Sequence, residues 1–143
     1  MEIKIVTKSG RVPAYETAQS AGFDLTAYLP DGDFVLKAGE RALIPTGTYI
    51  ELPDGYEAQV RSRSGLSIKH GIGMTNGIGT IDPDYRGELR VPMINWSGED
   101  YTFHDGDRIA QVIINKFERV GFAVTDKLSE TERGSGGFGS TGR

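Results

Sequence analysis

The sequence of 143 residues contains no cysteine. This absence excludes disulfide bonds, thiolate nucleophiles and zinc sites with thiolate ligands. It is also compatible with a reducing compartment such as the cytosol.

Long apolar segments are absent as well. No run approaches the roughly 18 residues that a membrane span requires, and the first residues lack the basic-then-apolar pattern of a secretory signal. We therefore expect a soluble, cytoplasmic protein without a membrane partner.

Basic residues are fewer than acidic residues. Sixteen Lys and Arg face 20 Asp and Glu, for a formal net charge of −4. A nucleic-acid polymer is therefore not expected as the main partner. An anion could bind only where donors cluster locally.

Several catalytic motifs are missing too. His70 and His104 lie far apart in sequence, so a nucleophile paired with histidine has little support. Ser64 does not lie in a Gly-x-Ser-x-Gly elbow, and neither a Walker A loop nor a histidine-rich zinc pattern occurs.

Glycine, in contrast, is abundant, with 20 residues, and favours a turn-rich β protein. Short alternating segments separated by turn signals predict a single all-β domain, either a sandwich, a jelly roll or a closed barrel. The expected strands cover residues 1–7, 21–27, 34–36, 41–45, 48–52, 56–60, 108–117 and 122–124. One short helix is expected within residues 61–71, capped by Ser62 or Ser64 and ended by Gly71.

The stretch from residue 76 to residue 90 is the most unusual. Pro83 and Gly87 predict a turn between two β-prone runs, and hence a β-hairpin. Its tip carries Asp82, Asp84 and Tyr85, which a turn does not need. These residues alone fit a solvated tip as well as a reactive site.

Two further segments could bind an anion. Arg63 and Ser64 precede the expected helix, where an arginine and unpaired N–H groups can hold phosphate, although solvated arginines beside a capped helix are equally consistent. The segment 133–143 is rich in glycine and serine, so it is expected to be disordered alone and to order around an anionic ligand. Gln111, among apolar neighbours, needs a hydrogen-bond partner.

These residue types together suggest one chemistry. The carboxylates are Asp24, Asp82, Asp84 and Asp107; the phosphate donors are Arg63, Ser64, Gln111 and Arg133; the aromatic residues for a flat ligand are Tyr85 and Phe138. The set fits magnesium-assisted hydrolysis of a nucleotide phosphate, with a carboxylate activating water. A module that binds an anionic ligand without turnover remains the alternative.

Five motifs in order make the whole chain resemble the trimeric dUTPases. They are Ala21-Gly22-Phe23-Asp24-Leu25, Arg63-Ser64-Gly65-Leu66, Gly79-Thr80-Ile81-Asp82-Pro83-Asp84-Tyr85-Arg86-Gly87, Gly106-Asp107-Arg108-Ile109-Ala110-Gln111 and Arg133-Gly134-Ser135-Gly136-Gly137-Phe138-Gly139. The resemblance implies a jelly-roll-like homotrimer whose three active sites are each shared between subunits. It implies hydrolysis of dUTP to dUMP and pyrophosphate with Mg²⁺.

The resemblance also implies residue roles. Asp82 would activate the water that attacks the α-phosphorus, and Asp24 would contact Mg²⁺ through water. Substrate contacts are expected from Arg63, Ser64, Gly65, Asn76, Gly79, Thr80, Ile81, Tyr85, Gln111, Arg133, Ser135, Phe138 and Gly139, with Arg90 as a possible addition. Asn76 and residues 79–81 would hold uracil, Tyr85 the sugar, and residues 63–65 with Gln111 the phosphates. Residues 1–128 would form the β domain and residues 129–143 an arm that closes an active site.

Two departures and two rival functions follow from the same motifs. Ser62 stands where many dUTPases have proline, and Arg90 lies where the family is variable. The related dCTP deaminases have a catalytic glutamate five residues after the glycine that matches Gly87, and this chain has Pro92 there. A deaminase is therefore the weaker alternative, and a non-catalytic nucleotide-binding interaction protein is the other.

Overall fold

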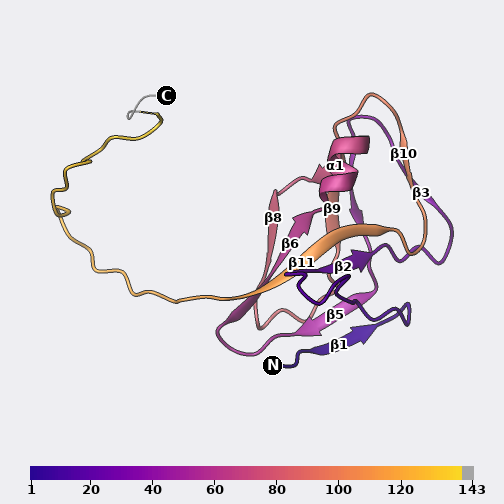
Figure 1. Cartoon of the computed structure of the whole chain (residues 1–143), viewed down its shortest axis with the longest axis horizontal. Helices are drawn as coiled ribbons and strands as arrows, with labels where there is room; N and C mark the ends of the chain where they lie inside the picture. The colour runs from indigo at the N-terminus through magenta and orange to yellow at the C-terminus, as the bar shows by residue number, and fades with distance from the viewer. Residues whose placement is uncertain (140–143) are drawn as a thin grey trace.

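The computed structural model describes residues 1–139. In this part of the chain there are eleven strands and one helix (Figure 1). In chain order they are β1 (Lys4–Thr7), β2 (Phe23–Thr26), β3 (Phe34–Leu36), β4 (Arg41–Ile44), β5 (Thr48–Glu51), β6 (Tyr56–Ser62), α1 (Ser64–His70), β7 (Ile72–Met74), β8 (Ile78–Ile81), β9 (Val91–Asn95), β10 (Tyr101–Phe103) and β11 (Arg108–Lys116).

The strands form small antiparallel sheets around one core. Their orders are β1-β5, β10-β3, β2-β11-β6-β8 and β4-β9-β7. Side chains alternate between core and surface, as in β2, where Phe23 and Leu25 are buried and their neighbours are half-buried. Leu25, Phe103 and Ile109 are completely buried and belong to this core. The prediction of an all-β, jelly-roll-like fold with one short helix is confirmed.

Most of the expected strands are present, with ends shifted by a few residues. The two short strands β7 and β10 were not anticipated. The strand expected at residues 122–124 is wrong, because this segment has no strand partner in the described chain and its side chains Phe122 and Val124 are exposed. Beyond β11 the chain runs away from the strands (Figure 1). A strand needs the edge of a neighbouring strand for its backbone hydrogen bonds, and within residues 1–139 this segment pairs with no such edge.

The hairpin expected across residues 76–90 is also wrong. Its first arm, β8, pairs with β6, whereas β9 pairs with β4 and β7. Residues 82–90 therefore connect two different sheets, and we call this segment the crossing loop. A tighter turn precedes β8, where Gly77, at φ 68°, donates its N–H to Met74 O at 3.3 Å.

The helix α1 lies where it was expected, but its start is capped differently. Arg63 occupies the N-cap position without a side-chain cap, so the prediction of Ser62 or Ser64 as the cap is wrong. Ser62 Oγ instead accepts the N–H of Met74 at 2.9 Å. Gly71 ends the helix at φ 64°, as predicted. Within residues 1–139 no helix has the length and hydrophobicity of a membrane span.

Candidate functional site

Asp82 lies immediately after β8, at the start of the crossing loop. The next residues form a turn in which Tyr85 donates its N–H to Asp82 O at 3.1 Å, and Pro83 suits the first inner position of such a turn. Asp82 is exposed. The predicted turn is therefore present, and it presents the carboxylate to solvent.

A small pocket of about 280 Å³ opens beside Asp82. It is lined by Leu43, Thr80, Ile81, Asp82, Tyr85, Glu88 and Arg90. Five of these seven were predicted site residues, and Leu43 and Glu88 were not. Its volume lies just below the roughly 300–1,000 Å³ typical of ligand pockets.

Asn76 and Gly79 lie upstream of this pocket, on the turn before β8 and on β8 itself. Gly79 is buried, and a Cβ built on it would lie 3.5 Å from Asn76 Nδ2. The two predicted uracil-binding residues are therefore neighbours. β8 pairs only with β6 in the described chain, so its other edge has no strand partner there.

Tyr85 folds back over the crossing loop. Its hydroxyl donates to Glu88 O at 3.0 Å, and its ring passes over Gly87. A Cβ on Gly87 would clash with the hydroxyl and ring of Tyr85, so a larger residue there would displace the ring. Glycine at this position thus has a steric cause.

A second cluster forms across β2, β11 and the end of β6. Asp24 faces Gln111 across the β2–β11 pair, and its side chain is only 16% exposed. Its two oxygens lie 3.4 Å from Arg63 Nε and 3.1 Å from Arg108 Nη1. Gln111 Nε2 donates to Ser62 O at 3.3 Å, which provides the predicted partner. We call these residues the arginine cluster.

Ser64 and Gly65 extend the arginine cluster toward solvent. They are the first residues of α1 and both are exposed. Arg63 Nη1 also donates to Arg108 O at 2.9 Å, which fixes the guanidinium near the strand. Arg108 was not predicted as a site residue, although it lies within one of the five motifs.

Asp82 and the arginine cluster lie at different ends of β6. Ile81 faces Ala58, whereas Arg63 follows Ser62, the last residue of the strand. Four residues of strand separate these points, or roughly 13 Å. Among residues 1–139 no hydrogen bond, ion pair or shared pocket joins the two groups.

The predicted arm residues lie away from both groups. The segment carrying Arg133, Ser135, Phe138 and Gly139 follows the long excursion after β11 (Figure 1). Phe138 is fully exposed, and Arg133 Nε donates to Gly136 O at 2.9 Å. The structure does not bring the arm to this chain's own pocket. Residues 140–143 of the expected arm lie outside the described residues.

The carboxylates do not form a metal cage. Residues 1–139 contain no group of three or more His, Asp or Glu side chains arranged to hold an ion. Both oxygens of Asp24 are already paired with arginines.

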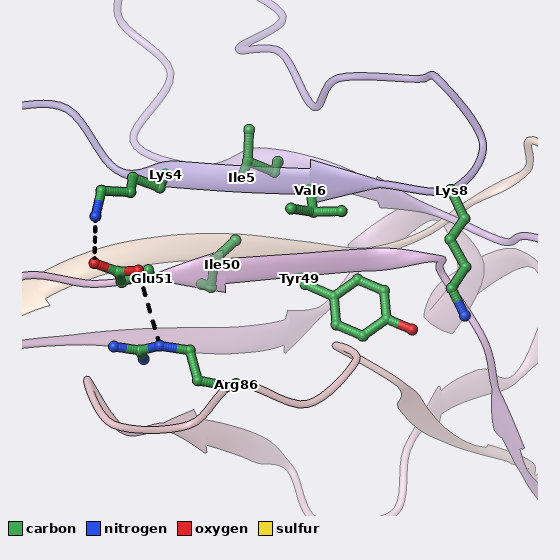
Figure 2. A pocket seen from close by; sticks show the side chains of 8 residues that line it. All are labelled: Lys4, Ile5, Val6, Lys8, Tyr49, Ile50, Glu51 and Arg86. Atoms are coloured by element: carbon green, nitrogen blue, oxygen red, sulfur yellow. Dashed lines mark hydrogen bonds and ion pairs between the residues drawn. The ribbon is translucent and has the colours of Figure 1, made fainter.

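A larger groove of about 450 Å³ runs along β1 and β5 and contains none of the predicted site residues (Figure 2). At one end Glu51 lies 2.7 Å from Lys4 Nζ and 3.9 Å from Nε of Arg86 in the crossing loop. The hydrogen bond from Lys4 lowers the pKa of the Glu51 carboxyl. The crossing loop is thus also tethered to β5, by an exposed ion pair.

Comparison with known proteins identifies the relatives of this chain. A family model described as dUTPase matches residues 8–142. The deoxyuridine 5'-triphosphate nucleotidohydrolase of Finegoldia magna is 54% identical over 143 residues, 99% of each chain. A structure of a Staphylococcus bacteriophage 80alpha dUTPase variant with dUpNHpp has a TM-score of 0.88 at 25% identity, over 99% of both chains. The dUTPase of phage phi11 of S. aureus, with a described structural Mg(II) ion, has a TM-score of 0.79 at 22% identity, over 89% of this chain and 98% of its own. The chain belongs to the dUTPase family.

Proposed function

We propose that this chain hydrolyses dUTP to dUMP and pyrophosphate. The observation that carries the proposal is the pocket that Asp82 and Tyr85 share with the outer edge of β8. It has a carboxylate, that of Asp82, among its lining residues. The name of the 54% identical relative gives the substrate class.

Uracil would be recognised by main-chain groups of residues 79–81 together with Asn76. The outer edge of β8 offers alternating N–H and C=O groups, because the strand pairs with β6 on one side only in the described chain. Uracil presents acceptor, donor and acceptor atoms along its pairing edge. Cytosine would place a donor where uracil has an acceptor, and the unpaired buried groups would penalise it strongly.

Tyr85 would pack against the deoxyribose. The hydroxyl is held by its hydrogen bond to Glu88 O, and the ring passes over Gly87. These contacts restrict movement of the ring. A 2′-hydroxyl would collide with it. The same residue therefore supports a preference for the deoxynucleotide.

Asp82 would orient a water molecule and accept its proton as the water attacks the α-phosphorus. The bond from that phosphorus to the bridging oxygen then breaks, and pyrophosphate leaves. Aspartate is a weak base, so cations must stabilise most of the charge that develops. Arg63, Ser64, Gly65 and Gln111 are the proposed phosphate contacts.

Mg²⁺ is the proposed cofactor. It would be bound chiefly by the triphosphate and water, with Asp24 in contact through water. When bound, it supplies positive charge that neutralises the phosphate oxygens. Asp24 would also position Arg63 and Arg108, because each of its oxygens is paired with one of the two guanidinium groups.

A homotrimer with shared active sites would join the two separated groups. Asp82 of one subunit would meet the arginine cluster of another, since the two groups lie roughly 13 Å apart along β6 within one chain. Residues 129–143 would cross to a site as an arm. Phe138 would stack on uracil, Arg133 and Ser135 would reach the outer phosphates, and Gly139 and Arg90 would complete the substrate contacts.

The reaction itself is tested by incubating the protein with Mg²⁺ and each deoxynucleoside triphosphate in turn. We expect dUMP and pyrophosphate from dUTP only. Formation of dUTP from dCTP would favour the deaminase. Binding of dUTP without product would favour the non-catalytic interaction protein.

Replacing Asp82 tests the general base. We expect Asp82→Asn to keep the affinity for dUpNHpp, measured by calorimetry, while kcat falls by a factor of about 10²–10⁴. Asp84→Asn removes a carboxylate two residues away that does not line the pocket, and should retain turnover. Near-normal turnover in Asp82→Asn would reject this assignment.

Mixing two inactive variants tests the shared site. Arg63→Ala and Asp82→Asn, refolded together at equal amounts, should recover about a quarter of the sites when each site takes the two residues from different subunits. Mixing Arg63→Ala with Gln111→Ala is the matched control, because both changes affect the same cluster and no recovery is expected. No gain for the first mixture, with mixed trimers verified by native mass spectrometry, contradicts the shared site.

The arm is tested by truncation and by two substitutions. Removal of residues 133–143 should lower kcat while light scattering still detects a trimer. Phe138→Ala should lose about 1–3 kcal/mol of binding free energy, the usual value of base stacking, whereas Phe138→Trp should retain it. Full activity of the truncated chain would exclude the arm from the mechanism.

A further inference from the structure

Glu88 joins the crossing loop to the turn between β4 and β5. Its Oε1 accepts the N–H groups of Thr46 at 3.1 Å and Gly47 at 2.8 Å. Gly47 has φ 64°, so both N–H groups of this tight turn point to one acceptor. The Glu88 side chain is only 19% exposed, and its Oε2 lies 3.8 Å from Nε of Arg90.

The main chain around Glu88 is bonded to the same turn. Thr46 Oγ1 donates to Leu89 O at 2.6 Å, and Leu89 N–H donates to Thr48 O at 2.8 Å. Thr46 itself is buried. The position of Glu88 is therefore determined by the folded body and not by the loop alone.

Tyr85 takes its position from Glu88 in turn. The tyrosine hydroxyl donates to Glu88 O, and the Tyr85 side chain makes no other hydrogen bond in the described chain. A continuous path thus leads from the β4–β5 turn through Glu88 to the aromatic ring in the pocket. A shift of Glu88 would move the ring.

The other tether of the crossing loop is weaker. Arg86 Nε and Glu51 are 3.9 Å apart, and their side chains are 55% and 41% exposed (Figure 2). Such an exposed pair adds little stability. A half-buried carboxylate that accepts two N–H groups makes charge-assisted hydrogen bonds, which are the stronger kind.

We propose that Glu88 is a positioning residue that holds Tyr85 against the sugar and thereby determines discrimination between dUTP and UTP. The proposal rests on the proposed function, in which Tyr85 excludes a 2′-hydroxyl. Glu88 acts through the ring and does not itself react. The feature that matters is the Oε1 acceptor, because this atom binds the N–H groups of Thr46 and Gly47.

The test compares kcat/KM for dUTP and for UTP in Glu88→Ala, Glu88→Gln and the control Glu40→Ala. Because a misplacement on the order of 1 Å can change rates by up to about 100-fold, we expect Glu88→Ala to lower the dUTP to UTP ratio about ten-fold or more. Glu88→Gln keeps an oxygen for Thr46 and Gly47 and should restore the ratio. Glu40 is an exposed carboxylate in another turn, and its removal should change nothing.

A double-mutant cycle separates positioning from general loosening. In a Tyr85→Phe background the bond to Glu88 O is already lost, so Glu88→Ala should lower the ratio by a smaller factor. An unchanged ratio in Glu88→Ala, or an equal loss in Glu88→Gln, overturns the proposal. If Glu88→Ala does not fold, Glu88→Asp decides instead, because it withdraws the acceptor by one methylene and should lower the ratio.

Discrimination between the two sugars is also measured as the ratio of two Kd values, one for dUpNHpp and one for its ribose counterpart. This readout does not depend on turnover. An unsubstituted chain that binds dUpNHpp but leaves dUTP intact refutes hydrolysis, while the Kd ratio of the variants still decides the role of Glu88.

Discussion

The unpaired edge of β8 is the constraint on which the site depends. In the described chain β8 is the last strand of its sheet, and exposed strand edges attract unwanted partners unless something covers them. The buried Gly79 and the tight turn at Gly77 leave this edge accessible next to Asn76. A base that fits those main-chain groups would satisfy them, so the proposed recognition of uracil would also protect the edge.

Much of the fold could be predicted from local patterns. Alternation located the strands, and Gly71 located the end of α1, because each depends on a few adjacent residues. The pairing of β8 could not be predicted in this way. Residues 82–90 resemble a hairpin turn, yet β8 and β9 belong to different sheets, and the choice of partner depends on chain segments far away in sequence. The Asn76-Gly77 pair was the available signal for the real turn.

The site residues also divide into those that local motifs indicate and those that depend on tertiary contacts. Asp82 and Tyr85 share a pocket, and Asp24, Arg63 and Gln111 lie together, as their motifs suggested. Glu88 and Arg108 could not be assigned from sequence, since a glutamate or arginine on a polar stretch is ordinarily solvated. Their roles arise from tertiary contacts, namely the N–H groups of Thr46 and Gly47 for Glu88 and the Asp24 carboxylate for Arg108.

The ion pairs of the arginine cluster bear on the proposed role of a divalent ion. Arg108 lies 2.9 Å from Glu16 as well as 3.1 Å from Asp24, and Arg63 shares Asp24. Asp24 and Glu16 thus offset part of the positive charge of Arg63 and Arg108, while Arg61 lies opposite Gln111 on the neighbouring strand. Such pairing holds the arginines in place and weakens their attraction for a highly charged triphosphate. In the proposed function, Mg²⁺ carried with the nucleotide would add positive charge at the phosphates while Asp24 keeps the arginines aligned.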